Sequence, residues 1–196
     1  MRILAILTGW IGLVAAGFWF LGAKFFIPVE RPSGSIDPKS ILGKSAPTNV
    51  DPNSKKIVVL NFWNPDCPCS RFMDDHIKDI QRQFPAEKVK FIHVIEGVEE
   101  LPVSAKKEIT LPDRPSEIQI DADGSLARKY GVWAAPGAVV LDRQGKVAYV
   151  GAYNTSRYCD DKDGAYAQKA IEALLKGQSP KVENLPFYGC RNLGTP

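Results

Sequence analysis

The hydrophobic and polar positions divide the chain into an apolar N-terminal stretch, a proline-containing segment and a long region in which strand and helix patterns alternate. Residues 3–23 are apolar or small throughout, and the next residue, Lys24, carries a charge. A helix of that length spans about 30 Å, which matches the hydrocarbon core of a bilayer. The pattern therefore predicts a membrane anchor over residues 1–24. A cleaved signal segment is the alternative.

Two further segments lack a regular pattern. Residues 25–54 are interrupted by prolines with scattered glycine and serine, which predicts a tether. Residues 178–196 have a similar composition and are expected to form a C-terminal tail. Between them, residues 55–177 carry the pattern of one globular domain.

The globular region alternates short apolar runs with helix-periodic segments. The pattern predicts strands at 57–63, 89–95 and 118–120, helices at 69–84, 124–130 and 163–176, and a β-hairpin from 138–141 and 146–151. In the first helix, Phe72, Ile77, Ile80 and Phe84 recur at near-helical spacing. Residues 98–115 receive no assignment. The order predicts an α/β fold: a central mixed sheet flanked by helices, with parallel pairing first and an antiparallel hairpin last.

Composition and charge exclude several classes of function. The chain is 44% hydrophobic and 24% charged, which is ordinary for a globular protein. Its net charge of +3 and the absence of any Lys/Arg run longer than two residues argue against a nucleic-acid partner. No Gly-x-Gly nucleotide loop is present, and no cofactor is expected.

The most informative segment lies between the first strand and the first helix. It reads Asn-Phe-Trp-Asn-Pro-Asp-Cys-Pro-Cys-Ser-Arg over residues 61–71, with Cys67 and Cys69 one residue apart. A cysteine at a helix N-terminus is favoured as a thiolate, the nucleophilic form. The total of four cysteines is even, which fits an oxidising compartment and permits three pairings.

This segment resembles the redox motif of the thioredoxin-like superfamily, which follows a strand ending in Phe-Trp and opens a helix. Counted from Trp63, Cys67 falls on the first family cysteine and Ser70 on the second, with Arg71 behind it. The chain departs from the pattern because serine occupies the second position and Cys69 stands between. The resemblance covers about residues 45–177 and implies a thioredoxin-like fold.

A second local match supports the resemblance. The stretch from Tyr130 to Pro136 resembles the family segment before its cis-proline, which faces the redox cysteines and exposes the preceding backbone for pairing with an extended substrate. Carried over, Pro136 would be that cis-proline and Ala135 would offer its backbone. A trans turn proline is the alternative.

The resemblance implies a thiol–disulfide oxidoreductase whose partners are protein thiols and disulfides. Cys67 would attack a partner disulfide, Cys69 would resolve the mixed disulfide, Ser70 would hydrogen-bond a sulfur, and Arg71 would add positive charge. A strained Cys67–Cys69 disulfide would be readily reduced. With Arg2 and the amino terminus kept in the cytoplasm, the protein is expected to be a single-pass protein of the inner membrane with its domain in the periplasm.

Other uses of the cysteines remain open. Cys67 and Cys69 are soft ligands that could hold Cu(I) in a binding or assembly module, although His76 and His93 are expected to be surface or packed residues. A thiol peroxidase is not supported, because the Thr or Ser that its motif requires ahead of the cysteine is missing. A pure interaction scaffold is a third possibility.

Cys159 and Cys190 have two alternative roles. In the thioredoxin-like fold the loop that carries Cys159 would lie beside Cys67, so Cys159 could be the resolving thiol. A structural Cys159–Cys190 bridge that pins the tail is the favoured prediction, because the chain after the closing helix is long enough to return. That pairing leaves Cys67 and Cys69 as the redox pair.

Overall fold

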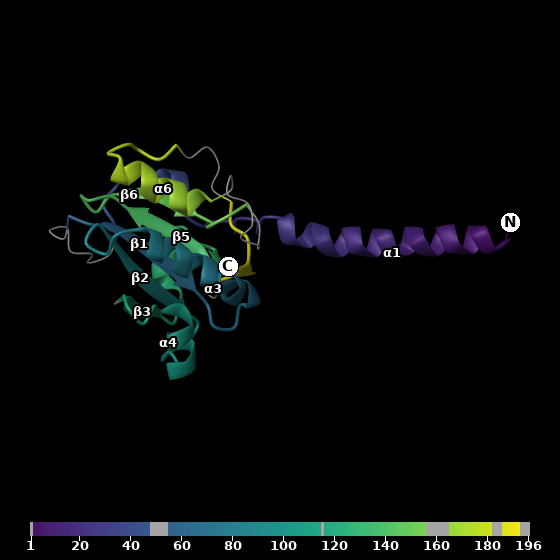
Figure 1. Ribbon diagram of the computed structural model, residues 1–196. Helices are drawn as coiled ribbons and strands as arrows, with labels where there is room; N and C mark the ends of the chain where they lie inside the picture. The colour runs from purple at the N-terminus through teal and green to yellow at the C-terminus, as the bar shows by residue number, and fades with distance from the viewer. Residues whose placement is uncertain (1, 48–54, 115, 156–164, 182–185, 193–196) are drawn as a thin grey trace.

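The computed structural model describes residues 2–47, 55–114, 116–155, 165–181 and 186–192, and the architecture is stated for these residues (Figure 1). In chain order the elements are α1 (Arg2–Phe26), α2 (Pro38–Ile41), β1 (Ile57–Trp63), α3 (Pro68–Gln83), β2 (Val89–Glu96), α4 (Val103–Ile109), β3 (Glu117–Asp121), α5 (Ser125–Lys129), β4 (Ala134–Ala135), β5 (Gly137–Leu141), β6 (Val147–Gly151), α6 (Tyr166–Leu175) and β7 (Cys190–Arg191).

A five-stranded mixed sheet forms the centre of the domain, with strand order β3–β2–β1–β5–β6. The central strand β1 pairs in parallel with β2 and antiparallel with β5. The register aligns Phe62 with Gly137, so the C-terminal end of β1 lies beside the start of β5. The chain that leaves Trp63 is therefore next to the chain that enters β5.

Both faces of the sheet are covered. On one face, Ile57 and Val59 pack with residues of α3 and α6. On the other, Val58 and Leu60 pack with residues of α5 and of the N-terminal segment before β1. This alternation buries every residue of β1 and explains its almost continuous apolar sequence.

The predicted α/β class and central mixed sheet are confirmed. One position of the helix pattern is wrong: Phe72 is 65% exposed, and Met73 packs in the core in its place. The region 98–115, which the pattern leaves unassigned, contains α4. Its Ile109 packs with Trp63 and Ile95 in a separate small cluster.

The expected tether is packed against the domain over much of its described length. Val29, Ile41 and Leu42 contact the core cluster on the α5 face. The Gly43 N–H donates to the carbonyl of Val147, whose own N–H donates to the carbonyl of Lys44. The segment thus joins the open edge of β6, and α2 lies within it.

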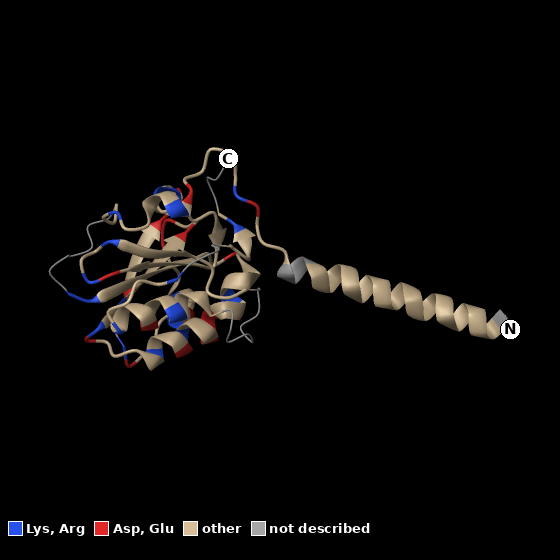
Figure 2. Ribbon diagram, turned by 90° about the horizontal axis from the view of Figure 1, so that it is seen from above, with Lys and Arg blue, Asp and Glu red and all other residues tan. Residues whose placement is uncertain are grey.

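Helix α1 projects away from the domain (Figure 1), and its segment Ile3–Ala23 is long and apolar enough to cross a membrane. Charged residues are spread over the globular part, whereas α1 shows none between its two ends (Figure 2). In Figure 1 the yellow C-terminal segment lies beside the start of α3, on the side from which α1 extends.

Candidate functional site

Cys67 is the N-cap residue of α3, with Pro68 opening the helix. A turn built on Asn64 holds it there: the Cys67 N–H donates to the Asn64 carbonyl, and the Asp66 N–H donates to Asn64 Oδ1. The cysteine is 1% exposed. Its sulfur therefore lies at the positive end of a 16-residue helix, where a thiolate is stabilised.

The structure joins Cys67 to Cys190 by a disulfide, with the two Cα atoms 5.9 Å apart. The predicted Cys159–Cys190 bridge is therefore wrong, and so is the predicted Cys67–Cys69 pair, since Cys69 is a buried free thiol. Cys159 itself lies outside the described residues. The tail thus brings Cys190 to the redox motif.

The peptide bond between Ala135 and Pro136 is cis, as predicted. The carbonyl oxygen of Ala135 lies 3.4 Å from the sulfur of Cys67, so this turn faces the disulfide. Strand β4 precedes the proline, and it pairs antiparallel with β7, with Ala135 opposite Cys190. The backbone that the resemblance reserves for a substrate is paired here with the chain's own tail.

The tail is anchored on both sides of Cys190. The Phe187 side chain is fully buried and packs edge-to-face on Trp133, with ring centroids 4.5 Å apart. The Phe187 carbonyl accepts a hydrogen bond from the Val29 N–H, and the indole N–H of Trp133 donates to the Val29 carbonyl. Beyond the disulfide, Asn192 donates from its backbone to the Trp133 carbonyl and from its side chain to that of Val132.

The remaining residues of the motif have distinct surroundings. The Ser70 hydroxyl is fully buried and accepts a hydrogen bond from the Asn64 N–H, a role in the turn that the sequence interpretation missed. Arg71 is exposed. The sulfurs of Cys67, Cys69 and Cys190 all lie within 4.8 Å of one another, so three thiols meet at this point when the disulfide is reduced.

Two buried carboxyl groups lie near the ends of the central strands. Asp74 on α3 accepts a hydrogen bond of 2.8 Å from the indole of Trp63, and burial raises the pKa of its carboxyl to about 7. At the end of β2, burial and the neighbouring charge of Asp121 raise the pKa of Glu96 to about 9. Both Glu96 oxygens are buried without a hydrogen-bond partner among the described residues. Glu96 is consequently protonated at neutral pH.

A polar chain crosses the core beneath α3 and α6. The Tyr153 hydroxyl donates to Asn61 Oδ1, and the Asn61 amide nitrogen lies 2.9 Å from Nδ1 of His93. Since an amide nitrogen only donates, Nδ1 accepts and the proton of the neutral ring sits on Nε2. Burial, with a smaller effect from Lys78, lowers the pKa of His93 to about 4, so this histidine is a packed neutral residue.

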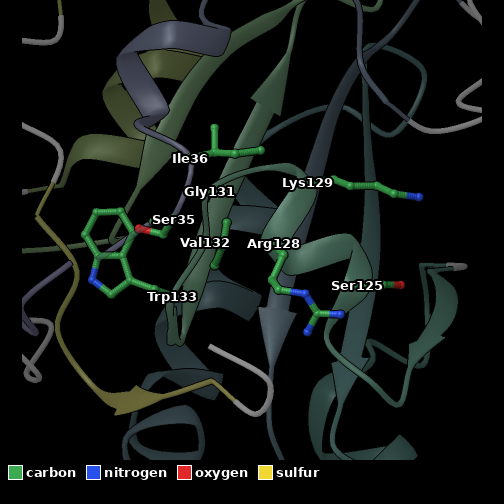
Figure 3. A pocket seen from close by; sticks show the side chains of 9 residues that line it. Ser35, Ile36, Ser125, Arg128, Lys129, Gly131, Val132 and Trp133 are labelled. Atoms are coloured by element: carbon green, nitrogen blue, oxygen red, sulfur yellow. The ribbon is translucent and has the colours of Figure 1, made fainter. Parts of the chain in front are cut away.

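A pocket of about 460 Å³ lies apart from the three sulfurs, between the N-terminal segment and α5 (Figure 3). Ser35 and Ile36 form one side, and Arg128 and Lys129 of α5 extend along the other. Trp133 lies at its end, close to the C-terminal strand. The pocket contains no cysteine in its lining.

Comparison with known proteins covers most of the packed structure. The family model described as "Domain of unknown function (DUF6436)" matches residues 40–192, which include the end of the N-terminal segment, the redox motif and Cys190. The chain belongs to the DUF6436 family, within the thioredoxin-like superfamily. The matched region of this DUF6436 protein ends at Asn192, the last described residue of the tail.

Curated relatives of this DUF6436 protein are described as redox enzymes. It is 30% identical over 126 residues to "Thiol-disulfide oxidoreductase ResA" of Bacillus cereus (strain ATCC 10987 / NRS 248), covering 58% of this chain and 70% of the relative. The protein of the same name from Bacillus thuringiensis subsp. konkukian (strain 97-27) is 30% identical over 122 residues, covering 56% of this chain and 68% of that relative.

Solved structures share the fold of this DUF6436 protein. A hypothetical protein from Sinorhizobium meliloti 1021 matches with a TM-score of 0.62 and 20% identity, covering 83% of this chain and 97% of that one. An uncharacterized conserved protein from Geobacillus kaustophilus matches with a TM-score of 0.63 and 21% identity, covering 78% of this chain and 91% of that one. At these identities the likeness concerns the fold alone.

Sequence reasoning located Cys67 and Pro136 but missed the residues that seat the tail. Phe187 and Gly189 lie in a segment interpreted as irregular, where no periodic pattern marks them. The available signal was the combination of an aromatic residue, a glycine and a cysteine near the C-terminus. The serine at position 70, which leaves Cys67 without the family partner, was a second signal.

Proposed function

We propose that the protein is a membrane-tethered thiol–disulfide oxidoreductase that works through Cys67, with Cys190 as its internal disulfide partner. The observation that carries the proposal is the Cys67–Cys190 disulfide, placed at the N-terminus of α3 and beside the cis peptide of Pro136. The curated relatives described as thiol-disulfide oxidoreductases support the same chemistry.

The exchange reaction assigns different roles to the two sulfurs. A partner thiolate attacks the Cys67 sulfur, the Cys67–Cys190 bond breaks, and Cys190 leaves as a thiolate that takes a proton from solvent. A second partner thiolate then attacks the partner sulfur of the mixed disulfide and releases Cys67 as a thiolate. The partner dithiol loses two electrons and the Cys67–Cys190 pair gains them. The helix N-terminus stabilises the departing Cys67 thiolate, which makes Cys67 the better leaving group in the second step.

We assign the membrane attachment to α1 and the redox domain to the periplasm. The length and composition of α1 support a single span. The chain first contacts the packed domain at Val29, close to the end of that helix. The proposed location is the inner membrane with the redox domain on the periplasmic side, because that oxidising compartment would keep the disulfide formed.

A test of the proposed activity uses the full chain in detergent micelles. Reduction of insulin and reshuffling of a scrambled disulfide protein should both be catalysed by the wild type across glutathione redox buffers. Cys67→Ser should abolish turnover. Cys190→Ser cannot form the internal disulfide, but its Cys67 thiolate should still attack a substrate disulfide and accumulate as an unresolved Cys67 adduct. The proposal fails if wild type and Cys67→Ser are equally inactive in every buffer.

A second candidate function is the binding of Cu(I), which the three clustered sulfurs favour. Sulfurs about 2.3 Å from a trigonal metal would be about 4 Å apart, and the Cys67, Cys69 and Cys190 sulfurs already lie within 4.8 Å of one another. Only the reduced protein would present three thiolates. Native mass spectrometry of the reduced full chain with limiting Cu(I) tests this candidate. Stoichiometric binding lost in Cys69→Ser would support it, and no binding would reject it.

A further inference from the structure

The described tail occupies the edge of β4. Cys190 of β7 lies opposite Ala135 in an antiparallel ladder, and the Asn192 N–H continues the pairing to the carbonyl of Trp133. An extended partner chain cannot pair with this edge while β7 is seated there. The oxidised protein therefore carries its own strand where a partner strand would dock.

Gly189, directly before Cys190, meets a steric constraint that the ladder alone does not impose. Its φ angle is +142°, in the region that L side chains rarely adopt. A Cβ atom on Gly189 would collide with the carbonyl oxygen of Ala135 and lie 3.2 Å from Cδ of Pro136. A strand that places its cysteine on Cys67 along this path thus has room only for glycine at the preceding position.

The tail can leave this edge without losing all its contacts. Phe187 is fixed in the core, and Gly137 passes so closely beneath it that an added Cβ there would lie 2.9 Å from the phenylalanine ring. In the strand that follows, Cys190 is half-buried and Arg191 is exposed, so the outer part of the segment faces solvent. Residues 188–192 are therefore the part that can be exchanged.

We propose that residues 188–192 are an internal copy of the partner segment, and that partners are extended chains in which glycine immediately precedes the reactive cysteine. The inference rests on the proposed oxidoreductase function and deepens it by naming the substrate class. The partner strand replaces β7 on the Ala134–Ala135 edge as its thiolate attacks the Cys67 sulfur and Cys190 departs. The same carbonyl of Ala135 then selects against a side chain before the partner cysteine.

Synthetic peptides test the proposed selectivity on the full-length oxidised protein in detergent. The probe is Tyr-Gly-Cys-Arg-Asn, the sequence of residues 188–192, and the matched control carries valine in place of glycine. Mass spectrometry after acid quenching measures formation of the Cys67–peptide disulfide. The glycine peptide should react at least about ten-fold faster. A valine at this position would have to adopt a φ angle that L side chains rarely adopt, and its Cβ atom would collide with the Ala135 carbonyl oxygen. Mercaptoethanol serves as the thiol that needs no docking.

The outcomes separate this inference from the proposed function. Rates for the two peptides within about two-fold of each other, with mercaptoethanol also reacting, would overturn the glycine requirement and leave Cys67 as a reactive site. Failure of all three thiols to open the disulfide would overturn the oxidoreductase itself.

A variant of the protein provides an independent measurement. Gly189→Ala should weaken the seating of β7 and speed entry of the glycine peptide by at least about three-fold. The matched control is Gly34→Ala, at another glycine of positive φ, where an added Cβ meets nothing within 4 Å. An unchanged rate in Gly189→Ala, or an equal acceleration in Gly34→Ala, would contradict the proposal.

Discussion

Replacement of Phe187 by alanine should make the Cys67–Cys190 disulfide easier to reduce. Phe187 is fully buried, packs on Trp133 and precedes Cys190 by three residues. Its anchoring keeps the Cys190 thiol close to Cys67 after reduction. Removing the ring leaves the backbone pairing of β7 but takes away the largest buried contact of the tail.

The expected shift in reduction potential follows from the docking free energy. Truncation of a buried phenylalanine costs about 3–5 kcal/mol. If about 3 kcal/mol of this is docking of the tail in the reduced protein, the effective concentration of Cys190 at Cys67 falls by about 150-fold. For a two-electron couple 30 mV corresponds to about 1.4 kcal/mol, so the potential rises by up to about 65 mV.

Equilibration of the full-length protein in glutathione buffers, followed by alkylation and mass spectrometry, gives the oxidised fraction and hence the potential. Phe84→Ala is the matched control, because Phe84 is 7% exposed and packs in the cluster on the opposite face of the sheet. It should lose comparable stability and keep the wild-type potential. A Phe187→Ala potential within about 10 mV of wild type, with the protein folded, would refute the anchoring argument.

Three further outcomes follow from the same structure. The raised pKa of Asp74, about 7 against 3.8, means that the folded protein holds a proton which the unfolded chain releases, so the free energy of unfolding should fall as pH rises from about 4 to 7. Asp74→Asn keeps an acceptor for the Trp63 indole and should remove about 1–2 kcal/mol of this fall in urea titrations, after allowance for solvent screening. Glu96→Gln should leave stability near pH 4 almost unchanged and raise it by a growing amount as pH rises to about 9, measured by thermal unfolding, because over that range the unfolded wild-type chain releases the proton that the folded protein keeps. Oxidation should raise the free energy of unfolding by about 2–5 kcal/mol because the bridge joins residues 123 apart, and Cys69→Ser should preserve this difference while Cys190→Ser abolishes it.

The sheet could be predicted because its strands and helices are recorded in local patterns. The run from Ile57 to Trp63 is apolar at every position except Asn61, since β1 is buried on both faces. Asn61 interrupts the pattern because its amide is satisfied by Tyr153 and His93. The exposed Phe72 was misassigned because two adjacent apolar residues, Phe72 and Met73, fit a helical stripe nearly equally well.

The pairing of the cysteines could not be predicted from such patterns. It depends on a return of the tail that is fixed by Phe187 on Trp133 and by the ladder between β4 and β7, contacts between residues far apart in the sequence. Chain length alone permitted Cys190 to reach several partners. The cis bond of Pro136 was predictable only because its surroundings resemble a known family segment.

The pairing of Cys67 with Cys190 is the central claim, and peptide mapping of the oxidised full-length protein tests it most directly. Digestion with trypsin should yield three cysteine-containing peptides: residues 57–71 with Cys67 and Cys69, residues 158–162 with Cys159, and residues 182–191 with Cys190. Under non-reducing conditions, peptides 57–71 and 182–191 should appear joined, with fragmentation locating the bond at Cys67 and alkylation marking Cys69. A joined pair of 158–162 and 182–191, or a bridge within 57–71, would contradict the account.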